Sequence, residues 1–379
     1  MKRKILILLC LIFFIVSVSC VSAAEDVNQT VNDGADDLVV SDDTLSVSLS
    51  DDQIGAKDDG TFTALQEKIN NAPEGSTISL ENDYQYSGET DSQTVYISKK
   101  ITINGNGFSV SGNSDFSTLS IDSTVDNVEL NNINFYKGHR IISGDLNEGN
   151  LIINNCSFSA ASVSGSWYCS GGAIACNNII AKNCYFGGNR GYNPRIVSPV
   201  PCGGAVECNR GIFENCVFKE NTAAAGGAIS GWNLYVDSCV FINNNAVRDD
   251  GASDIYANYN LTVLNSVFLN AYNKNNLIKC DQHQNQKVDS SYFWFGNGAD
   301  NYAVKPVVDA DTYLDDGLTS WLFLNGTATP SQISLGKNST IVFNFYLYDD
   351  ISKKVMSFDD SRLSDLSIQL FLGSDGEEH

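Results

Sequence analysis

The chain has 379 residues and a formal net charge of −22, and loss of the three basic residues near its N-terminus would make the charge −25. A balance this acidic argues against nucleic acid or an anionic membrane surface as a partner, because both would repel the protein. Hydrophobic residues make up 42% of the chain and charged residues 18%, which is typical of a folded protein and not of a disordered one. A chain of this length can hold two or three domains.

Residues 1–24 have the composition of a secretory signal peptide. Three basic residues are followed by an apolar run from Ile5 to Val18 and then by small residues ending at Ala24. The apolar run is short for a membrane span, although a retained anchor is the alternative. We therefore expect a protein that is secreted or displayed at the cell surface, with no membrane span in the mature chain.

Residues 25–60 form an acidic leader. They contain eleven acidic residues, one basic residue (Lys57) and no aromatic residue. Like charges without aromatic side chains cannot collapse into a core, so we expect a disordered spacer.

The pattern changes at Thr61. Apolar residues fall at helical spacing between positions 62 and 72, Thr63 and Gln66 have the spacing of a capping box, and Pro73 follows. We expect a short amphipathic helix that covers the open end of a solenoid. Alternating apolar and polar runs then predict strands at 76–80, 94–98, 100–105, 108–112, 118–122 and 127–135.

A repeated phrase organises the middle of the chain. Gly-Gly-Ala-Ile/Val occurs at 171–174, 203–206 and 226–229, and each copy is followed by Cys-x-Phe, whose Cys lies 11 residues after the Ala. The Cys and Phe share one face of a strand, while the paired glycines allow close approach of backbones and an Asn before the Cys suits a bend. Such a unit cannot bury its apolar face alone, so the repeats should stack at about 4.8 Å with each Phe above the next. This pattern predicts an all-β protein, a parallel β-helix over residues 61–315.

These motifs resemble those of known surface proteins. The Gly-Gly-Ala-Ile/Val phrase followed by Phe-x-x-Asn (Phe186 to Asn189, Phe218 to Asn221) is similar to the repeat of chlamydial polymorphic membrane proteins. Over residues 60–350 the chain resembles more closely the adhesin-like surface proteins of methanogenic archaea. The resemblance implies a signal peptide, a right-handed parallel β-helix and Ig-like domains.

Residues 316–379 have a different pattern. Trp321 to Tyr348 alternates strongly between apolar and polar residues, like the opening strands of an Ig-like sandwich. Because about 100 residues are usual for such a domain, we expect a partial Ig-like segment here.

Parallel β-helices often cleave acidic polysaccharides, so an enzyme must be considered. Within the repeats, Asp249 and Asp250 form an adjacent acidic pair, flanked by Arg248 and Asp254, but no His lies near it. Glycoside hydrolysis needs a paired acid and base, and a solvated turn explains these carboxylates equally well. There is no Ser/His/Asp arrangement, zinc motif or nucleotide loop. We therefore expect no catalytic, cofactor-binding or metal-binding residues, and no enzyme activity.

The candidate ligand-binding residues lie in two long loops. Residues 159–170 and 187–201 interrupt the repeat on neighbouring coils and should emerge from one side of the solenoid. Exposed aromatic and Arg side chains are typical of partner-binding patches, although variable loops without a ligand are an equal alternative. The candidates are Trp167, Tyr168, Arg190, Tyr192 and Arg195.

The mature chain would hold nine cysteines, an odd number. Those of the Cys-x-Phe phrases should be buried thiols, because a cross-link along a regular ladder would be strained: Cys156, Cys184, Cys216 and Cys239. Two candidate disulfides between adjacent coils are Cys169–Cys202, at the bases of the long loops, and Cys176–Cys208. In a reducing compartment all would be thiols.

Two classes of function remain open. The first is an exported, adhesin-like protein that binds a glycan or protein on another cell, and the second is a carbohydrate-active β-helix enzyme. A passive envelope protein is a third possibility. The sequence does not name the ligand or the oligomeric state.

Overall fold

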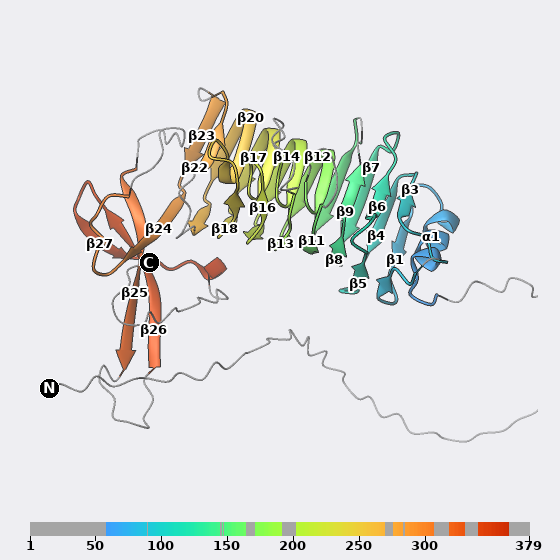
Figure 1. Cartoon of the computed structure of the whole chain (residues 1–379), viewed down its shortest axis with the longest axis horizontal. Helices are drawn as coiled ribbons and strands as arrows, with labels where there is room; N and C mark the ends of the chain where they lie inside the picture. The colour runs from blue at the N-terminus through green and yellow to red at the C-terminus, as the bar shows by residue number, and fades with distance from the viewer. Residues whose placement is uncertain are drawn as a thin grey trace, which may run out of the picture. The chain divides into compact units, whose positions relative to one another are not determined.

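The computed structural model describes residues 58–163 (except 89, 145 and 147), 171–191, 202–269, 276–306 (except 283 and 284), 318–329 and 340–363. These residues form a parallel β-solenoid of right-handed type with about 8 turns. The predicted fold class is thereby confirmed. Figure 1 shows the strands stacked side by side from the N-terminal helix onward.

Helix α1 (Phe62–Asn71) packs against the first coils and buries Phe62, Leu65 and Ile69, as predicted. The predicted capping box is wrong, because Thr61 is the N-cap and its hydroxyl accepts a hydrogen bond from the amide of Ala64. Gln66 instead docks the helix on the solenoid, since its amide accepts from the Tyr96 backbone nitrogen (2.6 Å) and donates to the Tyr96 carbonyl (3.0 Å).

Two sheets form the main walls of the solenoid, and each coil gives a strand to both. Sheet 1 consists of β1 (Thr77–Ser79), β3 (Val95–Ile97), β4 (Ile101–Asn104), β6 (Ser117–Ile121), β7 (Asn127–Asn131), β9 (Arg140–Gly144), β10 (Asn150–Asn154), β12 (Ile174–Lys182), β14 (Val206–Glu214), β17 (Ile229–Asp237), β20 (Ala252–Leu264), β22 (Asn276–Cys280) and β23 (Gln286–Asp289). Sheet 2 begins with β2 (Tyr84–Gln85), β5 (Ser109–Ser111), β8 (Asn134–Gly138), β11 (Ser157–Ala161), β13 (Tyr185–Gly187), β15 (Val217–Lys219), β18 (Val240–Ile242), β21 (Val267–Leu269) and β24 (Tyr292–Gly298). A small third sheet pairs β16 (Thr222–Ala223) with β19 (Asn245–Ala246).

A column of stacked rings fills the core, as the repeat predicted. Phe218 lies between Phe186 and Phe241, with ring centroids 4.8 and 5.1 Å apart and nearly parallel planes. The column continues through seven coils: Phe135, Phe158, Phe186, Phe218, Phe241, Phe268 and Phe293. Its members are partners in the register of sheet 2, so the predicted register is confirmed.

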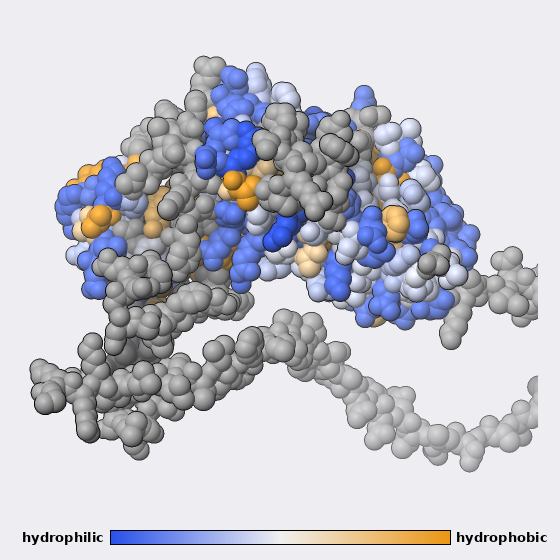
Figure 2. All heavy atoms as spheres, in the orientation of Figure 1, coloured by the Kyte–Doolittle hydropathy of each residue, from blue (hydrophilic) through white to orange (hydrophobic). Residues whose placement is uncertain are grey.

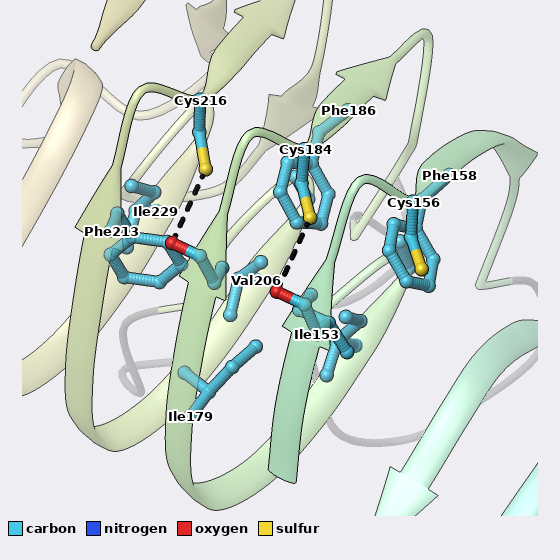
Figure 3. Packing of buried hydrophobic residues seen from close by; sticks show 14 of the residues in the cluster. Ile153, Cys156, Phe158, Ile179, Cys184, Phe186, Val206, Phe213, Cys216 and Ile229 are labelled. Atoms are coloured by element: carbon cyan, nitrogen blue, oxygen red, sulfur yellow. Dashed lines mark hydrogen bonds between the residues drawn. The ribbon is translucent and has the colours of Figure 1, made fainter. Parts of the chain in front are cut away.

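The cysteines of the repeat form a second column beside the rings (Figure 3). All four are buried thiols, as predicted: Cys156, Cys184, Cys216 and Cys239. The thiol of Cys184 donates to the carbonyl of Ile153, one coil away. Burial raises the pKa of Cys156 to about 12, so this sulfur stays protonated at neutral pH.

Turn residues and glycines follow the predicted roles. Asn155, Asn183 and Asn215 precede their Cys residues with φ near +53°, a conformation that Asn tolerates well. A side chain on Gly172 would collide with the carbonyl oxygen of Gly204 on the next coil, so glycine is needed for this close approach.

The Asn of each Phe-x-x-Asn step forms a buried ladder. The amide nitrogen of Asn189 donates to the side-chain oxygen of Asn221, and that of Asn221 donates to Asn244, both at 3.0 Å. Each of these amides also donates to the backbone carbonyl of a Phe on the preceding coil, such as Phe186 for Asn221. Asp254 accepts from Asn244 at 2.9 Å and is fully buried. The ladder therefore satisfies backbone groups at the corner where the coil turns away from sheet 2.

The C-terminal strands continue sheet 2. β25 (Ser320–Thr329) pairs with β24, and then β26 (Thr340–Asp349) and β27 (Lys354–Ser357) follow as an antiparallel meander. A 3-10 turn lies at Ser361–Leu363. The segment whose alternating pattern predicted strands thus forms strands, whereas its Ig-like character stays a prediction.

Candidate functional site

The predicted loop patch falls largely outside the described residues. Trp167, Tyr168, Tyr192 and Arg195 lie outside them. Arg190 is described, and it is exposed. Its backbone bridges Ser162 on one neighbouring coil and Thr222 on the other.

The candidate disulfides have different outcomes. Cys169 lies outside the described residues, so its pairing with Cys202 stays a prediction. The Cys176–Cys208 link is not formed in the structure, where Cys208 is a buried thiol. The two residues are register partners on β12 and β14. Parallel strands hold such partners about 4.8 Å apart with their side chains side by side, whereas a disulfide needs Cβ atoms about 3.8 Å apart.

The acidic residues considered for catalysis do not gather into one site. Asp249 and Asp250 are exposed, and Asp250 accepts a hydrogen bond from Nε of Arg248 at 2.7 Å, which lowers the pKa of its carboxyl group. Asp254 faces the interior, where it ends the asparagine ladder. A retaining or inverting hydrolase would need two carboxylates facing one sugar, and this pair does not provide them.

A groove crosses the middle of sheet 1, where the long strands bend. It has a volume of about 210 Å³. Three consecutive residues line it from each of three adjacent strands, Ala175–Asn177 on β12, Glu207–Asn209 on β14 and Ser230–Trp232 on β17, and Asn258 on β20 completes it. Because the lining segments lie at one level on neighbouring coils, the groove runs along the solenoid axis and across the strands.

A β-bulge exposes two aromatic side chains at one end of this groove. Gly231 pairs with Ala257 and Asn233 pairs with Asn260, so Trp232 stands opposite two residues of β20, Asn258 and Tyr259. Bulges of this kind redirect side chains and are frequent next to functional sites. Trp232 is 56% exposed and Tyr259 is 49% exposed.

The rest of the lining combines small residues with three amides and a carboxylate. The amide of Asn209 donates to the side-chain oxygen of Asn177 at 2.8 Å, and Asn258 donates to the Gly231 carbonyl at 3.3 Å. These bonds hold the amides in place, and each amide has donor and acceptor capacity beyond the bond named. Glu207 adds a carboxylate.

The floor of the groove consists of residues that face the core. Cys208 lies between Glu207 and Asn209 and is buried, and burial raises the pKa of its thiol well above the usual value. A thiol in this state is a weak nucleophile, so it contributes an apolar floor and not a reactive group.

Sequence reasoning missed this groove, although one signal was present. Trp232 lies four residues after Ala228 of its Gly-Gly-Ala phrase, where the two preceding repeats have Asn177 and Asn209. A large aromatic residue at an outward position of a repeat is a departure that core packing does not explain.

The structure therefore defines a parallel β-solenoid protein with a polar and aromatic groove across one wall. Comparison of the chain with protein-family models, with curated proteins and with solved structures gave no match. Among the described residues, no helix is long and apolar enough to cross a membrane, and no three His, Cys, Asp or Glu side chains gather as metal ligands would. On the face shown in Figure 2, hydrophobic side chains form small separate patches on a hydrophilic surface.

Proposed function

We propose that the protein is exported and acts at a cell surface as an adhesin-like protein, which binds a glycan or a protein on another cell or surface. The signal-peptide pattern of residues 1–24 and the resemblance to adhesin-like proteins of methanogenic archaea support this proposal. The observation that carries it is the groove of sheet 1, where exposed aromatic rings lie beside fixed amides. Concave sites with a few placed polar groups are typical of ligand binding.

Binding without turnover is favoured by the lining of the groove. Among its lining residues, Glu207 is the one carboxylate, whereas glycoside hydrolysis ordinarily uses two. An enzyme of the polysaccharide-cleaving class remains the second candidate because the solenoid fold suits it.

One experiment separates these candidates. The purified protein is applied to an array of glycans and to cultured cells, and the same preparation is incubated with polysaccharides while reducing ends and unsaturated sugars are measured. We expect retention on the array or on cells and no release of sugar. Sugar release that Asp249→Asn, Asp250→Asn or Glu207→Gln abolishes would establish an enzyme, and absence of retention on every surface would refute adhesion.

A further inference from the structure

The groove of sheet 1 has a direction that restricts its ligand. Its lining repeats on β12, β14 and β17, whose outer members are about 10 Å apart at the usual strand spacing. Asn258 on β20 adds one further step along the axis. A ligand that follows these residues must therefore be elongated and lie parallel to the solenoid axis.

A peptide fits this location poorly. Each of the three lining strands is already paired on both sides at the groove. β12 pairs with β9 and β14, β14 with β12 and β17, and β17 with β14 and β20. Added peptide strands bind to free sheet edges, and none is present at this point. Amphipathic helices need a row of apolar anchor pockets, whereas the outward side chains here are amides, a carboxylate and one indole ring: Asn177, Asn209, Asn258, Glu207 and Trp232.

Sugars match the chemistry of the lining. One face of a pyranose ring consists of C–H groups and packs on an aromatic ring such as that of Trp232, while the hydroxyl groups at its rim bond to amides and carboxylates. The coil spacing of about 4.8 Å is comparable with the length of one pyranose unit in an extended chain. Successive coils can therefore contact successive sugars.

Charge selects among sugars. Glu207 lines the groove and the whole chain carries a formal charge of −22, so a uronic or sialic acid chain would be repelled. The straight course of the groove favours linkages that keep a chain extended over those that coil it.

We propose that this groove binds a neutral, β-linked, extended glycan, with one sugar stacked on Trp232 beside Tyr259 and its neighbours bonded to Asn177, Asn209 and Glu207. The proposal rests on the adhesin-like function and names the ligand class and the site for it. The shared chemistry fits a chain of hexoses or of N-acetylhexosamines, and the two are separated by the probes below.

The test is isothermal titration of the purified protein with four hexasaccharides. Cellohexaose and chitohexaose are the extended neutral probes, maltohexaose is the coiled neutral probe, and hexagalacturonate is the anionic probe. We expect binding of cellohexaose or chitohexaose, and at least tenfold weaker binding of the other two classes. Failure of both extended probes to bind, or equal binding of hexagalacturonate, would overturn the ligand class.

Variants test the site. Trp232→Ala should weaken binding at least tenfold, and Trp232→Phe should keep most of it because a ring is retained. Tyr136→Ala is the matched control, since Tyr136 is an exposed aromatic residue on sheet 2. This variant should bind the hexasaccharides as tightly as the parent protein does. Circular dichroism shows whether each variant is folded.

The outcomes distinguish the two proposals. If the protein is retained on the glycan array or on cells and Trp232→Ala is retained equally, the groove is not the site while the adhesin-like function stands. If no array glycan and no cell retains the protein, that function itself fails.

Discussion

Truncation of Phe218 is the most direct test of the stacked core. Its ring is fully buried, lies 4.8 Å from Phe186 and 5.1 Å from Phe241, and meets the edge of Phe213 at 5.7 Å. Removal of a buried Phe side chain costs about 3–5 kcal/mol of unfolding free energy, depending on how far the site can collapse. Here the neighbouring rings are held by their own coils, so little collapse is expected. Three lost ring pairs, two stacked and one edge-to-face, at about 0.5–1.5 kcal/mol each, add to the loss. We therefore expect Phe218→Ala to fall at the upper end, near 5 kcal/mol.

Urea denaturation followed by far-ultraviolet circular dichroism measures this effect. Tyr185→Ala is the matched control, because Tyr185 is adjacent to Phe186 on β13 but points outward and is 39% exposed. Phe218→Leu should lie between the two, because it keeps much of the volume and loses the stacking. Contacts in a solenoid are with neighbouring coils, so the loss can also split the transition into two steps. Equal denaturation midpoints for Phe218→Ala and Tyr185→Ala would refute the stacked core.

Three further results are expected. Asn221→Ala should cost about 2–3 kcal/mol because it leaves buried groups of the ladder without partners. Asn245→Ala, at an exposed position one coil further along the same corner, should change the urea midpoint little, and equal midpoints for the two variants would contradict the ladder. Iodoacetamide at pH 8 should not label Cys156 or Cys216 before denaturation, because burial raises both thiol pKa values, and peptide mass spectrometry that finds native labelling would disprove their burial. Burial raises the pKa of Asp91, but hydrogen bonds from Thr63, Ser87 and Phe62 outweigh this effect and leave the pKa lowered. The carboxylate therefore stabilises the fold above about pH 4, and this stabilisation is lost as the pH falls through the pKa of the folded state. The urea midpoint of Asp91→Asn should be lower than that of the parent protein at pH 7 and should decline less steeply in acid.

The repeat made the core predictable. Inward positions of a solenoid must satisfy the same packing on every coil, so the Phe, the Cys and the turn Asn recur at fixed spacing, and Phe218 could be placed between Phe186 and Phe241 from sequence alone. The predicted capping box was wrong because the side chain of Gln66 bonds to the backbone of Tyr96 and does not cap the helix. Tyr96 lies in a strand thirty residues further along the chain. Nothing local in the sequence indicates such a contact.

The candidate site was less predictable for a related reason. Outward residues are less constrained by stacking, so their pattern is weaker: Asn177 and Asn209 share one position of the repeat, but Trp232 replaces the Asn on the next coil. The bulge that exposes Trp232 depends on one additional residue in β20, which becomes visible only when Gly231 and Asn233 are aligned with Ala257 and Asn260. The predicted Cys176–Cys208 disulfide was wrong, although the two residues are neighbours on adjacent strands as expected. Neighbouring positions in a parallel ladder do not have the geometry that a disulfide needs.

The alternation within each strand separates the residues that hold the fold from those that line the proposed binding groove. Cys208 and Gly231 face the core, while Glu207, Asn209 and Trp232 on either side of them line the groove. Because the outward side chains contribute little to the stacked core, they can be exchanged without loss of the fold. A weakened titration of Trp232→Ala with an unchanged urea midpoint therefore reports on the ligand contact itself, whereas the same loss in Phe218→Ala would report on the fold. The same separation would allow neighbouring coils to carry different outward side chains on one scaffold.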